Sequence, residues 1–379
     1  MEQYLGLLKR VLSEGKPQYN ERTEQFMIVK SGDQSYFDFS QGFPLLTTKP
    51  VQMRWVGEEL FWMFRGETDD YSLNLRGVNI WNRNAFQHYL DRMGLNKQVK
   101  KNTHLWNQLF ETYESAMKDD RRFNSGLEVK GSQQKLFHEE RFDKNDSTLG
   151  PIYGQQWRRW KKYNGETVDQ IKKVIAGIKK DPGSRYHVIN AWNVAEIDEM
   201  AIKPCHPMVH FTVTRDKDLE AHMFQRSCDL FLGVPFNIAQ YALFTNMIAR
   251  ETGLNPLGFY HTYSNLHIYN GVAPRTDFLR VEDNLSKLQR KVKMAGKPED
   301  YLDIREWYLK HAPAESEGNE RKDHVPFVLE QLSKEPRSLP HLQMKDLHLF
   351  QMIEMPAKEV ISISGYEPIK WDCRAVMAA

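Results

Sequence analysis

The strongest constraint in this sequence is one thiol that precedes a polar, arginine-bearing block. Residues 203–207 read Lys-Pro-Cys-His-Pro, and residues 225–237 read Gln-Arg-Ser-Cys-Asp-Leu-Phe-Leu-Gly-Val-Pro-Phe-Asn. A thiol attacks as the thiolate, and a nearby guanidinium favours that charged form. If Cys205 is a nucleophile, the fold must therefore bring it close to Arg226. The alternative is that Cys205 is a small buried core residue, which is the commonest role of a free cysteine.

The two motifs together resemble the signature of the thymidylate synthase family, which pairs a Pro-Cys-His nucleophile with Gln-Arg-Ser, an aspartate and Gly-x-Pro-Phe-Asn. Further segments match the family in the same order along the chain. They are residues 21–23, 41–49, 59–62, 80–81, 149–157, 181–185, 191–194, 267–269 and 365–368. The resemblance implies an α+β fold, with a large mixed β-sheet that is covered by helices and packs against a partner subunit.

Composition excludes several other classes of protein. The chain has 379 residues, and its 52 basic and 50 acidic side chains leave a net charge of only +2. We therefore expect no nucleic-acid partner, because no overall basic field is present. Three cysteines without paired spacing are typical of a reducing compartment, and they do not form a metal motif. We expect no secretory signal and no membrane span, which predicts a cytoplasmic protein, or one in the host cytoplasm if a phage encodes it.

Apolar periodicity predicts helices over residues 5–12, 51–64, 168–178 and 237–250. Strands are predicted over 27–39, with a turn at 31–33, and over 186–192 and 209–213. Two polar, charged stretches at about 85–148 and 270–323 interrupt the family pattern. We predict one domain, 1–379, in which both stretches are insertions. They either decorate the surface, or they cap the active site or remodel the oligomer.

The resemblance implies chemistry at a uracil ring. A thiolate that adds to C6 makes C5 nucleophilic, and covalent attachment splits one difficult substitution into easier steps. Cys205 is the candidate nucleophile, and Arg226 is expected to stabilise its thiolate and to hold the nucleotide phosphate. Glu59 lies within an apolar helix, where burial can tune a carboxyl group for proton transfer. By resemblance, the remaining candidate catalytic residues are Tyr153, Asn193 and His206.

The resemblance also implies a nucleotide site. Asn237 matches the residue that reads the N3–H and O4 edge of uracil, whereas the branch of the family acting on deoxycytidylate carries an acid there. Arg185 matches an arginine donated across a homodimer interface, and Tyr186 replaces a second arginine usual in the family. These matches favour deoxyuridylate (dUMP). The predicted substrate-binding residues are Arg22, Arg185, Gln225, Arg226, Ser227, Asp229, Asn237, His267 and Tyr269.

The predicted cosubstrate is 5,10-methylenetetrahydrofolate, and no metal is expected. Asp229 matches the family position that grips the pterin, and Lys49 and Trp81 match other positions on the folate side. Ile202 and Phe236 complete the predicted folate-binding set.

Several departures from the family pattern concern the product. Asn84 stands where the family usually has a second tryptophan, residues 263–265 replace Gly-Gly-Asp, Lys203 replaces a small residue, and the tail 372–379 matches loosely. An amide in place of an indole can order water beside the folate. We therefore predict a deoxyuridylate hydroxymethylase, of the kind carried by phages with hydroxymethyluracil DNA. The alternatives are a thymidylate synthase and a catalytically silent nucleotide-binding relative.

Overall fold

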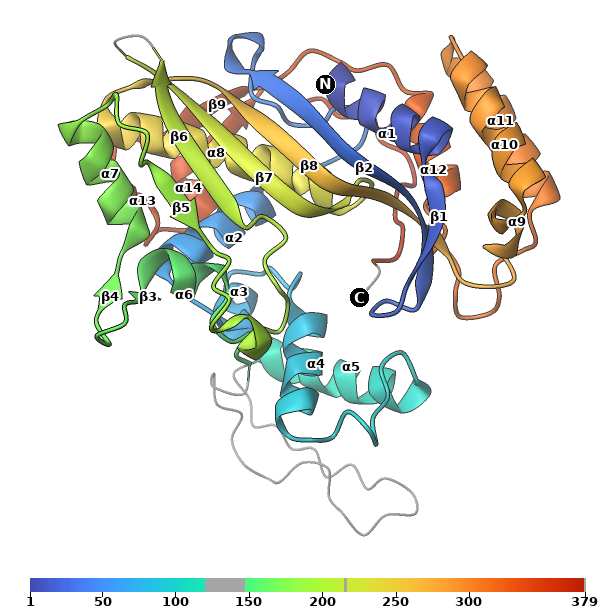
Figure 1. Ribbon diagram of the computed structural model, residues 1–379, viewed down its shortest axis with the longest axis horizontal. Coiled ribbons are helices and arrows are strands. Elements are labelled where there is room, and N and C mark those ends of the chain that lie inside the picture. The colour runs from blue at the N-terminus through green and yellow to red at the C-terminus, as the bar shows by residue number, and fades with distance from the viewer. Residues whose placement is uncertain (120–146, 215–216, 378–379) are drawn as a thin grey trace.

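A six-stranded mixed sheet forms the centre of the molecule, with strand order β1-β2-β8-β7-β6-β5 (Figure 1). The computed structural model describes residues 1–119, 147–214 and 217–377. Strands β7 and β8 run parallel, whereas the other neighbouring strands are antiparallel. The six strands span Lys16–Asn20 (β1), Gln25–Asp38 (β2), Val188–Asn190 (β5), Met208–Thr214 (β6), Asp218–Asp229 (β7) and Asn255–Gly271 (β8).

Helices cover one face of this sheet. Helix α8 (Gly233–Thr252) packs against β7 and β8, α2 (Met53–Arg65) packs against α8, and α1 (Glu2–Glu14) packs against β2. Most residues of α8 are buried, as expected for a helix that is apolar on nearly all sides. The predicted α+β architecture with a helix-covered mixed sheet is therefore confirmed.

The remaining elements lie around this core. The helices are α3 (Asp70–Leu75), α4 (Asn82–Arg92), α5 (His104–Asp119), α6 (Tyr153–Arg158), α7 (Gln170–Lys180), α9 (Asp277–Arg280), α10 (Glu282–Met294), α11 (Pro298–His311), α12 (Val325–Leu332), α13 (Leu349–Met352) and α14 (Ala357–Val360). Two small hairpins pair β3 (Trp160–Lys161) with β4 (Thr167–Val168), and β9 (His341–Met344) with β10 (Ile361–Ser364). Short 3-10 helices span Phe39–Gln41 and Ile197–Glu199.

The turn predicted at residues 31–33 is wrong. Strand β2 continues through this region and stays paired with β8, so that Ser31 lies opposite Asn265 and Asp33 lies opposite Tyr263. Gly32 adopts a φ of 71°, which glycine tolerates without strain. The long partner strand thus holds β2 straight where the local Ser-Gly-Asp sequence favours a reversal.

The predicted insertion at 85–148 is described as far as residue 119, and its part over 120–146 lies outside the described residues. Helices α4 and α5 pack through Phe86 and Trp106, whose rings lie 5.1 Å apart. Tyr113 of α5 donates to the buried Asp70 of α3 at 3.1 Å. This described part is therefore tied to the core by aromatic packing and a buried hydrogen bond.

The predicted insertion at 270–323 carries α9, α10 and α11, and a buried polar cluster closes its base. Arg275 Nε lies 2.8 Å from Asp323 Oδ2, and the two side chains are only 6% and 1% exposed. Tyr308 donates to the same carboxylate at 2.9 Å, and Asn270 donates to its other oxygen at 3.1 Å. Helix α10 also packs against α1. The whole segment is thus fixed to the core rather than loosely attached.

In the parts of the chain that the structure describes, no helix has both the length and the apolarity needed to cross a bilayer.

The buried ion pair predicts a large and specific loss of stability. We expect Arg275→Ala to lower the free energy of unfolding by about 3–5 kcal/mol, because Asp323 would stay buried without its counter-charge. The matched control is Arg280→Ala, which removes the exposed ion pair with Asp277 in the same segment and should cost less than about 1 kcal/mol. Urea denaturation measures both values, and equal effects would contradict the role of burial.

Candidate active site

Arg226 holds the loop that carries Cys205 against strand β7. Its backbone N–H donates to the carbonyl of Cys205 at 2.8 Å. Its guanidinium donates to the carbonyls of Pro204 at 2.9 Å and Lys203 at 2.6 Å, and lies over the ring of Trp192. The loop that carries the predicted nucleophile is therefore bonded to Arg226, whose guanidinium binds the backbone of this loop.

The thiol of Cys205 lies in a site that favours its neutral form. Burial raises the pKa of Cys205, and the positive charges of Arg226 and Arg22 only partly offset this effect. Tyr153 contacts the backbone of the same residue, since its hydroxyl accepts the Cys205 backbone N–H at 2.6 Å. The thiol is therefore protonated at neutral pH in the free enzyme, and it must lose this proton before it can attack.

Glu59 projects from α2 between two donors. Trp81 Nε1 donates to one carboxyl oxygen at 2.8 Å, and Gln240 Nε2 donates to the other at 2.7 Å. Burial raises the pKa of Glu59 to about 7, and these two hydrogen bonds limit the rise. A carboxyl group with this pKa can both accept and donate a proton near neutral pH. Gln240 is a site residue that no sequence motif indicated.

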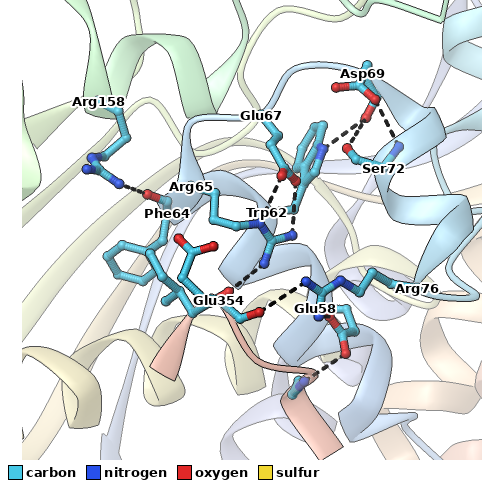
Figure 2. A network of polar contacts seen from close by, with 12 residues as sticks. Glu58, Trp62, Phe64, Arg65, Glu67, Asp69, Ser72, Arg76, Arg158 and Glu354 are labelled. Atoms are coloured by element: carbon cyan, nitrogen blue, oxygen red, sulfur yellow. Dashed lines mark hydrogen bonds and ion pairs between the residues drawn. The ribbon is translucent and has the colours of Figure 1, made fainter. Parts of the chain in front are cut away.

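Helix α2 is clamped in place at its outer side, which fixes the position of Glu59 (Figure 2). Arg65 donates to the backbone carbonyl of Ile353 at 2.6 Å, and the buried Glu58 accepts the backbone N–H of Ala357 at 2.7 Å. The segment 353–357, which leads into α14, therefore contacts α2 both at its middle and at its C-terminal end. Glu58, which precedes Glu59 in the helix, thus bonds to the backbone of Ala357 and has a structural role.

A row of polar side chains lies behind Asn237. Gln225 Nε2 donates to Asn237 Oδ1 at 3.0 Å, and Asn237 Nδ2 lies 3.1 Å from His206 Nε2. His261 Nε2 lies 2.7 Å from Gln225 Oε1. Burial lowers the pKa of His206 to about 3, so this imidazole is neutral. Sequence reasoning predicted His206, Gln225 and Asn237 but missed His261.

The predicted phosphate and sugar residues are only partly assembled in one chain. The charge of Arg22 influences the pKa values of Cys205, His267 and Tyr269, which places Arg22 on the same side of the site. His267 is buried and its Nδ1 contacts Asn265 Oδ1 at 2.9 Å. Ser227 is half-buried on β7. Arg185 is exposed and has no part in this cluster within the single chain.

Asn193 belongs to a separate network. Its amide donates to Gln156 at 3.1 Å and to Glu196 at 3.1 Å, and Glu196 pairs with Lys161. None of these bonds reaches Cys205. A catalytic role for Asn193 thus stays a prediction, and its observed contacts are those of a residue that organises the neighbouring loop.

Asp229 and Lys49, two of the residues predicted to bind folate, both contact the backbone of Phe231. Asp229 accepts the backbone N–H groups of Phe231 and Leu232, each at 3.1 Å, just before α8 begins. The ammonium of Lys49 is buried, donates to the carbonyl of Phe231 and lies 3.9 Å from the centre of its ring. Burial lowers the pKa of Lys49 to about 8. Ile202 and Phe236 are half-buried.

The C-terminal segment, residues 371–377, is bonded to the predicted insertion at 270–323. Arg321 forms two hydrogen bonds with the carboxylate of Asp372, at 2.8 and 3.1 Å, and also binds the carbonyl of Arg374. Trp371 Nε1 donates to the carbonyl of Thr48 at 2.8 Å, beside Lys49. This bond places the segment next to Lys49, one of the residues predicted to bind folate. No sequence motif indicated Arg321.

Within the described residues, no group of three or more His, Cys, Asp or Glu side chains is arranged to hold a metal ion.

Comparison with known proteins gives the family. The chain matches the thymidylate synthase family over residues 2–378. It is 38% identical over 309 residues to a thymidylate synthase of Listeria monocytogenes serotype 4b, which covers 80% of this chain and 93% of that protein. A thymidylate synthase of Listeria innocua serovar 6a is 36% identical over 307 residues, with the same coverage. The chain therefore belongs to the thymidylate synthase family.

Membership defines the class of reaction. Proteins of this family are folate-dependent enzymes that transfer one carbon to C5 of a pyrimidine nucleotide and use methylenetetrahydrofolate as cosubstrate. The predicted family, enzyme class and cosubstrate are confirmed. The roles of individual residues stay predictions that the geometry above makes specific.

The buried carboxyl group predicts a pH-dependent stability. In the folded protein the pKa of Glu59 is raised from 4.5 to about 7, so the unfolded chain ionises first as the pH rises. The wild type should therefore lose stability relative to Glu59→Gln between pH 4.5 and about 7, by about 3 kcal/mol in total. Denaturation across this range measures the difference. The exposed Glu335→Gln is the control, and a flat difference between the wild type and Glu59→Gln would contradict burial of an ionisable group.

The contact between Arg321 and Asp372 predicts a specific change in the C-terminal segment. Arg321→Ala should increase amide hydrogen exchange over residues 371–377 and leave α10 and α11 protected, because only the clamp is lost. The charge reversal Arg321→Asp with Asp372→Arg should restore most of the protection. Arg374→Ala, which removes the more exposed partner of Asp372, is the control. Unchanged exchange in Arg321→Ala would contradict the role of this ion pair and would show that other contacts, such as the bond of Trp371 with Thr48 and that of His324 with the Val376 carbonyl, anchor the segment.

Proposed function

We propose that this protein is a thymidylate synthase, which methylates dUMP reductively and releases dihydrofolate. The observation that carries the proposal is that two indole rings on the predicted folate side, those of Trp81 and Trp371, are held in place by hydrogen bonds. Trp81 is fixed by its bond to Glu59 and packs 5.9 Å from Trp62, while the segment around Trp371 is bonded to Thr48. Transfer of hydride to the pyrimidine requires that water be kept out while the folate stays stacked. The curated relatives named thymidylate synthase agree with this choice.

The proposed mechanism assigns a task to each group in the site. The Cys205 thiolate adds to C6 of the pyrimidine, and the electron pair moves to C5, which then bonds to the one-carbon unit. Glu59, with a pKa of about 7, moves protons at C5 and on the O4 side. Asn237 holds the N3–H and O4 edge, and the arginines hold the phosphate. Methylenetetrahydrofolate supplies the carbon and, for thymidylate, the hydride.

A second candidate is deoxyuridylate hydroxymethylase, and Asn84 is the observation that favours it. In this reaction water, rather than hydride, adds to the exocyclic carbon, and tetrahydrofolate leaves unoxidised. Asn84 lies one turn from Trp81, half-buried, and its backbone N–H donates to the Trp81 carbonyl at 3.0 Å. Its amide offers water a partner beside the Trp81 wall. The two candidates share every step up to the fate of the exocyclic carbon.

Product analysis separates the two candidates. With dUMP and methylenetetrahydrofolate, the proposal predicts a nucleotide mass gain equal to CH2, accompanied by dihydrofolate absorbance. A mass gain equal to CH2O without dihydrofolate would instead establish the hydroxymethylase. The variant Asn84→Trp sharpens the test, because it should shift any hydroxymethyl product towards thymidylate. A wild type that gives neither product from dUMP would refute both.

We also propose that two copies assemble through the uncovered face of the sheet. A stripe of half-exposed rings crosses this face on four strands, with 4.5 Å between Tyr36 and Tyr260 and 4.7 Å between Tyr260 and His222. His210 continues the stripe on β6. Aromatic side chains in such a row are typical of protein interfaces. The exposed Arg185 would then complete the phosphate site of the partner, in keeping with the family resemblance.

A cytoplasmic location and the absence of a nucleic-acid partner stay predictions from the sequence.

Subunit mixing tests this assembly. Cys205→Ala and Arg185→Glu should each be inactive alone, because one lacks the nucleophile and the other lacks the donated cation. After the subunits are unfolded together and refolded, activity should reappear, since each mixed dimer contains one intact site. Mixing Cys205→Ala with a variant carrying both substitutions is the control and should recover nothing. Failure of the first mixture to regain activity would contradict donation of Arg185 across an interface.

A further inference from the structure

Four side chains form an unbroken row of hydrogen bonds behind the candidate base-reading residue. The row runs from His261 on β8 through Gln225 on β7 and Asn237 on α8 to His206 in the Cys205 loop, with contacts of 2.7, 3.0 and 3.1 Å. His261, Gln225 and His206 are 0%, 2% and 6% exposed. The row therefore lies in the protein interior, where an unpaired donor or acceptor is costly.

The contact with the Ser227 carbonyl reveals the direction of this row. An amide side chain can present either end, so a partner with a single role identifies which end is which. A backbone carbonyl only accepts, and the Ser227 carbonyl lies 2.9 Å from Gln225 Nε2. Gln225 Nε2 consequently donates to Ser227 and to Asn237 Oδ1. Its Oε1 must then accept a hydrogen from His261 Nε2.

His261 is suited to supply that one hydrogen. Its ring is fully buried and packs at a tilt against Tyr263, with 3.9 Å between ring centres, and Phe259 lies 5.9 Å away on the same strand. Burial lowers the pKa of His261 well below its usual value, so the imidazole is neutral and carries a single N–H. Because Gln225 Oε1 can only accept, the hydrogen belongs on His261 Nε2, while Nδ1 has no hydrogen-bond partner among the described residues.

The direction of the row leaves the Asn237 amide with one defined arrangement of free hydrogen-bonding groups. Asn237 Oδ1 accepts from Gln225 and retains one lone pair, and Nδ2 donates to His206 and retains one hydrogen. The free lone pair and hydrogen match the N3–H donor and O4 acceptor of uracil. Cytosine needs the opposite pattern. Flipping Asn237 to suit cytosine would set its Nδ2 against Gln225 Nε2, which places two donors in contact.

We propose that His261 is a positioning residue that fixes pyrimidine specificity, because it holds Gln225, and through it the Asn237 amide, in the orientation that accepts uracil and rejects cytosine. This inference rests on the proposed use of a uracil nucleotide and does not depend on which product is made. It predicts that removal of one buried N–H, remote from the substrate, changes which base is bound.

Equilibrium binding of dUMP and dCMP to the full-length enzyme tests the proposal without requiring turnover. His261→Phe keeps an aromatic ring beside Tyr263 but removes the N–H, so the ratio of the two affinities should fall by about ten-fold or more. His261→Gln can place an amide N–H near the same point and should restore most of the ratio. Tyr263→Phe, which keeps the stacking ring, is the control and should leave the ratio unchanged. The ratio of kcat/KM values for the two nucleotides should follow the same order.

Two outcomes overturn different claims. A wild type that binds dCMP as tightly as dUMP refutes the proposed substrate, and this inference with it. A selective wild type whose ratio survives in His261→Phe overturns the inference alone. Nitrogen NMR of histidine-labelled wild type gives a test that needs no variant. We expect a neutral His261 with its proton on Nε2 and a neutral His206 with its proton on Nδ1, and the opposite assignment for His261 would refute the proposed direction.

Discussion

The arrangement of the candidate active site depends on one contact, in which the Arg226 side chain binds the backbone carbonyls of Lys203 and Pro204. Strands β6 and β7 are antiparallel neighbours, so the residues just before β6 return to the end of β7. The guanidinium closes this return, and the Cys205 loop is held further by Tyr153, whose hydroxyl accepts the Cys205 backbone N–H, and by the bond between His206 and Asn237. A lysine cannot replace it, because one ammonium lacks the fork that reaches two carbonyls.

Burial gives the site its chemical character. Glu59, His206 and Cys205 are all shifted towards their neutral forms, because each loses water as the sheet and helices close around it. Neutral groups have fixed numbers of donors and acceptors, so the site can read a base by hydrogen-bond pattern. A neutral carboxyl group beside Trp81 can also exchange protons with a substrate without first leaving a salt bridge.

Much of this arrangement can be predicted from the sequence, where short motifs and local periodicity carry the information. The pairing of Cys205 with Arg226 and the apolar helix around Glu59 are local patterns that the structure reproduces. Gln240, His261 and Arg321 could not be predicted, because their partners lie far away in the sequence and no fixed spacing connects them. Asn193 shows the converse, since a motif position indicated catalysis whereas its contacts are with Gln156 and Glu196. The straight path of β2 depends on β8, which local turn propensity ignores.

Covalent capture of the nucleophile tests the central claim most directly. A dUMP analogue with fluorine at C5 cannot lose a proton there, so a covalent complex formed with methylenetetrahydrofolate should persist after denaturation. Peptide mass spectrometry should find the nucleotide on the peptide that contains Cys205 and leave Cys228 and Cys373 unmodified. A complex that forms with Cys205 unmodified, or turnover of dUMP by Cys205→Ser at the wild-type rate, would contradict the account.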